Sequence, residues 1–217
     1  MPFQILDSVD AAHGLKHRKY DRSQLIIFAG KREHGKTYAC NAYIDEDEPR
    51  VLGLDPFGDF RGLSWPTEDR TSSSEALEDM AYYQRFCRRR ICPPFGASSR
   101  DWAEDFFVEC VDGEHPLTDA LLVLDEITLW TLPRESAALQ KLVLQGRRLG
   151  IRMVVCCQRV SLIPGVFLSE CTDLVVFRMT RPRDLDVIDD WASSHHEGRL
   201  SDIAPRLDIG ECVVVGL

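Results

Sequence analysis

The sequence predicts a three-layer α/β fold with a mainly parallel central sheet. Apolar runs alternate with helical patterns along the chain, which is the order that parallel strands joined by helices require. Several runs are too continuous for a strand with one wet face, as expected when helices cover both faces of a sheet. The predicted strands lie near 24–29, 50–55, 90–94, 120–125, 151–157, 173–179 and 211–216.

Helical spacing of apolar residues fills most of the intervals between these strands. Ser74 is expected to cap one helix with its hydroxyl, and Pro182 to stand in the first turn of another, where no N–H donor is needed. The predicted helices cover 36–44, 74–85, 101–110, 135–148, 183–191 and 200–207.

Segments 1–21, 61–73 and 112–119 carry turn-forming or charged residues without a hydrophobic period. The first is rich in His, Lys and Arg and is predicted to be a mobile arm or a subunit contact. None has the composition of a domain linker. A chain of 217 residues with 44% hydrophobic content is long enough for one sizeable core, so the sequence predicts a single domain over 1–217.

The lengths of the apolar runs and the cysteine pattern predict where in the cell the protein is located. The apolar runs are far shorter than the roughly 20 residues needed to cross a bilayer, and the N-terminus shows no basic-then-apolar signal pattern, so we expect no membrane insertion and a cytoplasmic location. The eight cysteines form no C-x-x-C pair and are predicted to be small reduced core residues. They occupy positions 40, 87, 92, 110, 156, 157, 171 and 212.

The formal charge of −9 argues against a broad surface that coats nucleic acid, because such binding depends on Lys and Arg. It leaves open a ring whose pore holds DNA with a few basic loops.

A phosphate-binding pattern, G-x-x-x-x-G-K-[ST], directly follows the apolar run Leu25–Ala29. A strand, a glycine loop and a helix N-terminus in this order surround a phosphate chain with backbone N–H groups. Lys36 is expected to reach the β- and γ-phosphates, and the Thr37 hydroxyl to ligate Mg²⁺. The predicted nucleotide-binding residues are Gly30, Lys31, Arg32, Glu33, His34, Gly35, Lys36, Thr37 and Tyr38.

Two carboxylates follow the apolar run Leu121–Leu124. Neighbouring residues at a strand end leave in different directions. Asp125 is therefore predicted to hold Mg²⁺ through water, while Glu126 activates the water that attacks the γ-phosphate. A buried strand that simply runs into an acidic turn is the alternative, and the phosphate loop upstream favours the catalytic interpretation.

Three further segments follow in a fixed order. They are Asp55-Pro56-Phe57-Gly58-Asp59 after a strand, Gly146-Arg147-Arg148-Leu149-Gly150-Ile151 before a strand that ends in Gln158-Arg159, and Leu174-Val175-Val176-Phe177-Arg178 followed by Arg183-Asp184-Leu185-Asp186-Val187-Ile188. With the two nucleotide motifs they resemble the HerA–FtsK superfamily of DNA-pumping ATPases, over about residues 24–216. The resemblance implies a RecA-like P-loop NTPase fold of the class with a catalytic glutamate (ASCE), acting on ATP with Mg²⁺.

The resemblance also implies roles for individual residues. The strand that carries Gln158 would lie between the phosphate-loop strand and the Asp125 strand, so its amide would position water or sense the γ-phosphate. Arg147 matches the arginine finger that one subunit extends to its neighbour, with Arg148 as the substitute. Capping of a helix C-terminus is the plainer interpretation of both arginines. Asp55 and Asp59 would shape the surrounding water network.

A finger supplied by a neighbour implies a homo-oligomeric ring, a pentamer or hexamer. Within the superfamily, the chain looks most like the compact genome-packaging ATPases of tailless, membrane-containing icosahedral viruses. That likeness implies double-stranded DNA and a viral capsid vertex as partners, and a place in the host cytoplasm or on the virion. Cys156-Cys157 and Val160 depart from the small Ala-Thr pair and the proline usual beside the glutamine.

The sequence is also compatible with other functions. A Zot-like virion-extrusion ATPase would bring a membrane anchor, and a cellular or plasmid DNA pump would bring additional domains. A small-molecule kinase is disfavoured by the Asp125-Glu126 pair, and a scaffold that binds nucleotide without turnover by Glu126, Gln158 and Arg147 together.

The remaining conspicuous residues are expected to have structural roles. Arg88–Arg90 are expected at a solvated or salt-bridged edge. His195-His196 lacks a second pair of metal ligands at useful spacing. Trp102, Trp130 and Trp191 are expected in the core or at subunit interfaces.

Overall fold

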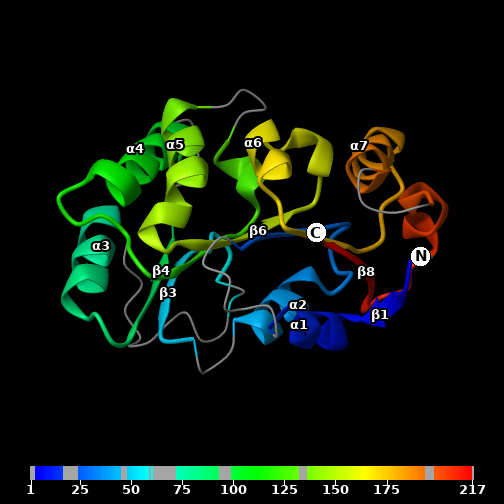
Figure 1. The fold of residues 1–217 in the computed structure, drawn as a ribbon, viewed down its shortest axis with the longest axis horizontal. Coiled ribbons are helices and arrows are strands. Elements are labelled where there is room, and N and C mark those ends of the chain that lie inside the picture. The colour runs from blue at the N-terminus through cyan, green and yellow to red at the C-terminus, as the bar shows by residue number, and fades with distance from the viewer. Residues whose placement is uncertain are drawn as a thin grey trace.

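A computed structural model describes residues 3–16, 24–44, 48–58, 60, 72–92, 99–131, 136–193 and 198–216. Its centre is one eight-stranded sheet in the order β1-β8-β7-β2-β6-β5-β3-β4 (Figure 1). The strands are β1 (Ile5–Asp7), β2 (Leu25–Ala29), β3 (Arg50–Leu54), β4 (Cys87–Ile91), β5 (Leu121–Leu124), β6 (Arg152–Cys157), β7 (Asp173–Val176) and β8 (Glu211–Gly216).

The sheet is mainly parallel, as predicted. Strands β2 to β7 run parallel to their neighbours, whereas β8 pairs antiparallel with β7 and β1 antiparallel with β8. The helices are α1 (Ser8–Lys16), α2 (Lys36–Tyr43), α3 (Ser73–Tyr82), α4 (Ser99–Asp112), α5 (Ala137–Gly146), α6 (Gly165–Ser169) and α7 (Pro182–Ser193).

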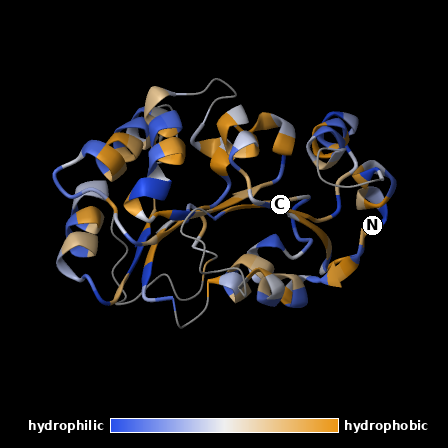
Figure 2. Cartoon of the chain, viewed as in Figure 1, coloured by the Kyte–Doolittle hydropathy of each residue, from blue (hydrophilic) through white to orange (hydrophobic). Residues whose placement is uncertain are grey.

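Helices cover both faces of the sheet. Figure 1 shows α1 and α2 below the sheet and α4, α5, α6 and α7 above it. Each face has its own apolar cluster, one containing residues of α3, α4, α5 and α7 and the other containing residues of α1 and α2. Figure 2 shows hydrophobic and hydrophilic residues alternating along the helices, as expected for helices with one buried face. Every residue of β2, β3 and β5 is buried, which explains the continuous apolar runs.

Strand β4 begins at Cys87, earlier than the predicted residue 90, and so contains all of Arg88–Arg90. The prediction was wrong because a charged run hid the strand period. Arg88 and Arg89 are buried yet bonded: Arg88 Nε donates to Glu48 O at 2.9 Å, and Arg89 Nε lies 2.7 Å from Asp79 Oδ2. Of the two interpretations offered, the salt-bridged edge is confirmed.

The N-terminal segment differs from the predicted loose arm. Its described part, residues 3–16, contains β1 and α1, and the Ala11, Ala12 and Leu15 side chains are buried in the cluster shared with α2. Alanines give a weak hydrophobic signal although they allow helices to pack closely, which is why the sequence pattern missed this helix.

Several helix boundaries also differ from the prediction. Ser72 rather than Ser74 caps α3 through Glu75 N, and Ser136 caps α5 through Leu139 N. The predicted helix at 200–207 is two short 3-10 turns, Leu200–Asp202 and Ala204–Arg206, where Pro205 has no N–H to continue a helix. The short helix α6 was not predicted. Segment 61–71 lies outside the described residues.

Three features bear on the remaining structural expectations. All eight cysteines are free, and all but Cys92 are buried. Trp130 is buried, while Trp102 and Trp191 pack partly buried against the larger apolar cluster. In the described part of the chain no helix has the length and apolar character to cross a bilayer.

Candidate functional site

A cleft of about 510 Å³ opens where β2, β6 and β5 end. The sheet order places β6 between β2 and β5, which is the placement that the sequence resemblance implies for the glutamine-bearing strand. Parallel strands bring their carboxyl ends to one edge, so the loops after these three strands meet there. The cleft is lined by Arg32, Glu33, Gly35, Lys36, Thr37, Tyr38, Phe57, Asp125, Glu126 and Gln158.

The glycine loop is anchored to both neighbouring strands. Gly30 N donates to Cys157 O at 3.1 Å, and Lys31 N donates to Arg178 O at 2.8 Å. A Cβ on Gly30 would lie 2.6 Å from Phe177 Cβ, and Gly35 has a φ of 100° directly before α2. Both positions therefore require glycine, one for close approach and one for the left-handed turn into the helix.

Lys36 is the buried cation of this loop. Its side chain is only 9% exposed, and Nζ donates to Lys31 O at 2.9 Å, so the side chain folds back over the loop. Burial lowers the pKa of the Lys36 ammonium, and the nearby Glu126 and Asp125 carboxylates partly oppose that shift. An ammonium group with so little solvation gains strongly from an anion placed in the cleft.

Glu126 is held by three hydrogen bonds at the end of β5. Its carboxylate accepts from Thr128 Oγ1 at 2.8 Å, from Gln158 Nε2 at 3.0 Å and from Gln158 N at 3.4 Å. Its backbone is left-handed, with φ 45° and ψ 54°, which is uncommon for a residue with a Cβ. The structure thus brings together the predicted water activator and the predicted γ-phosphate sensor.

Asp125 lies at the root of the cleft, 7% exposed. Asp125 N donates to Leu54 O at 3.0 Å, and its carbonyl accepts from Trp130 Nε1 at 3.0 Å, so backbone contacts on both sides hold the residue. The Thr37 hydroxyl and the Asp125 carboxylate are hard oxygen ligands that line one cleft. This donor set fits Mg²⁺. Among the described residues no group of three or more His, Cys, Asp and Glu side chains forms a separate metal site; His195-His196 lies outside them.

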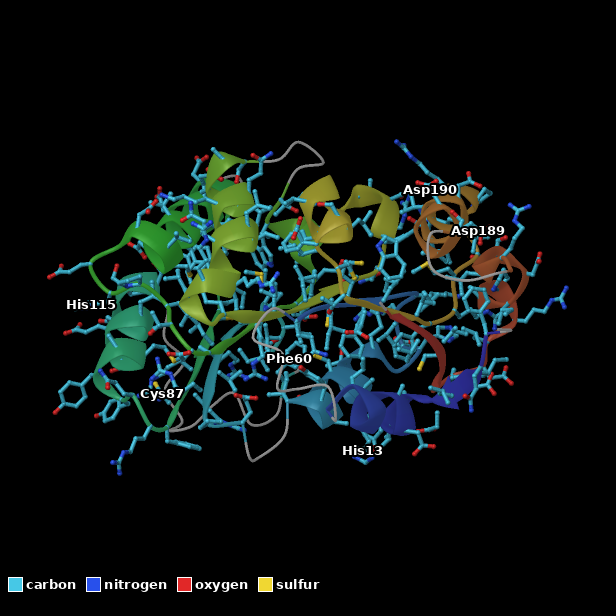
Figure 3. All side chains as sticks on the ribbon, viewed as in Figure 1. His13, Phe60, Cys87, His115, Asp189 and Asp190 are labelled. Carbon is cyan, nitrogen blue, oxygen red and sulfur yellow. The ribbon has the colours of Figure 1, made fainter. Side chains whose placement is uncertain are left out.

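Asp55 organises the Asp-Pro turn after β3. Asp55 is fully buried and accepts from Gly58 N at 2.8 Å and Phe60 N at 3.0 Å. It therefore stabilises the turn rather than lining the cleft. The turn presents Phe57, 57% exposed, at the cleft, while Phe60 packs inward near the centre of Figure 3. Asp59 lies outside the described residues.

Not every predicted nucleotide-binding side chain reaches the cleft. Gly30 lies beneath it at the strand end, and Lys31 lines a neighbouring cleft. His34 is buried under the loop, where Gly210 N donates to its carbonyl at 3.3 Å. Tyr38 is exposed and lines the cleft.

Arg147 and Arg148 lie apart from this cleft. Both follow α5 in a 3-10 turn directly before β6 begins, at the sheet edge opposite the phosphate loop. Both are exposed, and within the described residues no carboxylate pairs with either. They cannot contribute to the cleft of their own chain.

Sequence reasoning missed three participants. Phe57 stood inside a motif noted for its Asp-Pro turn, its glycine and its acids. Thr128 bonds Glu126 but follows it in an unremarkable turn. Asp184, 2% exposed at the start of α7, accepts from Arg159 Nε at 2.9 Å and Ser161 N at 3.0 Å. Only the position of Asp184 within the third motif hinted at a role.

No protein-family model matches the chain, and no curated protein matches it by sequence. Solved structures of similar fold include the genome packaging NTPase B204 from Sulfolobus turreted icosahedral virus 2 in complex with AMPPCP (TM-score 0.66, 14% identity, 90% of this chain and 93% of that one). The ATP-gammaS complex gives a TM-score of 0.63 at 13% identity, covering 90% and 93%.

B204 described as the DNA-packaging ATPase from Sulfolobus turreted icosahedral virus gives a TM-score of 0.64 at 13% identity, with 90% of this chain and 93% of that one covered. At these identities the likeness establishes the fold. The predicted three-layer P-loop NTPase fold is therefore confirmed.

Proposed function

We propose that this chain is a single-domain ATPase of the HerA–FtsK kind, which forms a homo-oligomeric ring and drives double-stranded DNA, most specifically a viral genome, into a capsid. The observation that carries the enzymatic part is the convergence on one cleft of a buried lysine and a carboxylate held by a glutamine. The shared fold with B204, itself a genome packaging NTPase, supports the biological part.

Substrate binding follows from the loop. Its backbone N–H groups, with Lys36 and Arg32, hold the phosphates of ATP, while Tyr38 and Phe57 border the exposed side of the cleft. Thr37 and Asp125 would hold Mg²⁺, which supplies neutralising charge for the phosphates. These groups bind and position ATP before any bond forms or breaks.

Hydrolysis then needs a base beside the γ-phosphate. A water oxygen forms the new bond to γ-phosphorus as the bond to the bridging oxygen breaks, and ADP leaves with that electron pair. Glu126 accepts the proton that the water loses. Gln158 holds the Glu126 carboxylate in the ground state, so a shift of the amide toward the γ-phosphate frees the carboxylate to accept a proton. Arg147 of a neighbouring subunit stabilises the transferred charge.

Translocation requires a ring, here of five or six subunits, placed at a capsid vertex in the host cytoplasm or on the virion. A packaging motor must accept every sequence of its genome, so its DNA contacts should go to phosphates.

The test is steady-state hydrolysis with duplexes of scrambled sequence over a salt series, at a protein concentration that permits assembly. We expect stimulation by every duplex, falling as salt rises. Strong preference for one sequence, or indifference to DNA even with capsids present, would contradict the packaging function.

A further inference from the structure

A second cleft, of about 420 Å³, adjoins the first on the α7 side of the phosphate loop. The two clefts share Arg32 and Gln158. The second is lined by Lys31, Arg32, Gln158, Arg159, Met179, Thr180, Arg181 and Asp184. Of the residues in this lining, only the shared Arg32 and Gln158 take part in the hydrolysis proposed above.

The lining of this cleft is basic, although the chain as a whole carries a net charge of −9. Among the described residues that line it, Asp184 is the only acid, and both oxygens of that carboxylate are occupied, by Ser161 N and by Arg159 Nε. Lys31, Arg32 and Arg181 are exposed, and none of the three has an ion-pair partner in the described part of the chain.

Three exposed cations around one hollow repel one another unless an anion lies between them. A cleft of this size accommodates a ligand of many atoms, so a single phosphate ion would leave most of it to water. The described part of the lining contains no aromatic side chain on which a base could stack, in contrast to the first cleft with Tyr38 and Phe57. The chemistry suits a chain of phosphodiesters recognised without reading its bases.

We propose that the second cleft binds the phosphodiester backbone of duplex DNA, with Lys31, Arg32 and Arg181 as the phosphate contacts. This inference rests on the proposed function and assigns its DNA-contacting residues. Because Gln158 and Arg32 belong to both clefts, a DNA phosphate bound here lies beside the residues that face the γ-phosphate of ATP. DNA binding and hydrolysis are then coupled through two shared side chains.

Arg181→Ala tests the assignment, with Arg183→Ala as the matched control. Arg183 is exposed two residues further on, in the first turn of α7, and it is not among the described residues that line either cleft. The assay is fluorescence anisotropy of a labelled duplex titrated with each protein, repeated at several salt concentrations. Stimulation of hydrolysis is measured in parallel as the ratio of the rates with and without DNA.

For Arg181→Ala we expect about tenfold weaker binding, a salt slope smaller by about 1, and an equal loss for every sequence. The ratio of rates should fall toward one, Arg181→Lys should recover most of the binding, and Arg183→Ala should match the native protein. Native binding should also resist an equal concentration of inorganic phosphate or poly-glutamate.

Contrary outcomes separate the two proposals. If the native protein binds duplex DNA and Arg181→Ala binds it equally well, the cleft assignment is wrong while the DNA motor stands. If the native protein neither binds nor responds to DNA, the proposed function itself fails. Displacement by inorganic phosphate would identify the cleft as a site for released phosphate, and displacement by poly-glutamate as a site for acidic protein segments; either result would overturn the DNA assignment.

Discussion

Glu126 combines an uncommon backbone with a fully engaged carboxylate. The left-handed φ of 45° turns the side chain back toward β6, where the amide of Gln158 meets it. The Glu126 carboxylate is therefore oriented but also restrained by its hydrogen bonds. A residue held in this way is suited to a step that must wait for a signal from the γ-phosphate.

Glu126→Gln should bind ATP as the native protein does and lose hydrolysis by about 10²- to 10⁴-fold, because the amide keeps the shape but accepts no proton. Nucleotide affinity and single-turnover rates would be measured for both proteins. The control is Glu114→Gln, an exposed glutamate outside the cleft, which should hydrolyse normally. Normal turnover by Glu126→Gln would mean that another group activates water.

His34 ties stability to pH. Burial lowers the pKa of its imidazole below 6.5, and Arg178, Lys31 and Lys36 add to the shift. The unfolded chain therefore takes up a proton at a higher pH than the folded one, so the free energy of unfolding should fall as pH drops from about 6.5 through the lowered pKa.

The measurement for His34 is urea unfolding from pH 7.5 to 5. His34→Gln should show a shallower pH dependence than the native protein. His115→Gln, at the far end of the molecule in Figure 3, should keep the native slope. Equal slopes in all three proteins would exclude His34 as the titrating group.

At the scale of elements, the segment that follows β6 is bonded to α7 directly after Gln158. Asp184, near the start of α7, binds both Arg159 and Ser161, the residues that follow the glutamine along the chain. Two bonds to one buried carboxylate fix this segment against the helix. We therefore expect Asp184 to act as a positioning residue for Gln158, and through it for Glu126.

Asp184→Asn keeps an oxygen for Ser161 N but loses the ion pair with Arg159. We expect kcat to fall by about tenfold or more with little change in KM for ATP, since small displacements near a reacting centre are costly. Asp189→Asn is the control, because Asp189 on the same helix (Figure 3) likewise accepts from an arginine, Arg199, and from Ser201 N. Equal effects of both variants would indicate a loss of stability only.

The elements that sequence predicts well are those with one strong period. Strands β2, β5 and β6 stood out because both faces are covered, and the motifs at their ends located the cleft. The sequence pattern placed β4 too late because arginines, bonded to Asp79 and Glu48, stand where apolar residues would mark the strand. It missed α1 because alanines form the packed face of that helix. The contacts of Glu126 with Thr128 and of Asp184 with Arg159 depend on side-chain direction, which no spacing in the sequence specifies.

At the scale of the whole molecule, the two edges of the sheet carry complementary halves of the proposed reaction. The phosphate loop and Glu126 lie at one edge, and Arg147 lies at the other. Under the proposed function, Arg147 would reach a γ-phosphate only on a neighbouring subunit, and repeated head-to-tail contacts of this kind would close into a ring. Hydrolysis should therefore rise with protein concentration.

Mixing Arg147→Ala subunits with Glu126→Gln subunits should restore part of the hydrolysis that each lacks alone. Some interfaces in a mixed ring then join an intact Glu126 to an intact Arg147. The measured quantity is the hydrolysis rate against the mixing ratio, with assembly followed by light scattering. Mixtures that assemble but stay inactive would leave Arg147 as a helix cap, and the same experiment with Arg148→Ala would show which arginine acts.

Gly210 joins three distant parts of the chain. Its N–H donates to His34 O in the phosphate loop at 3.3 Å, and its carbonyl accepts from Ser8 N, where α1 begins, at 2.8 Å. It directly precedes β8, the last strand along the chain and the one inserted between β7 and β1 (Figure 1). During translation the phosphate loop and β1 leave the ribosome long before this residue does. The phosphate loop and the start of α1 therefore gain this shared support only after residue 210 has been synthesised.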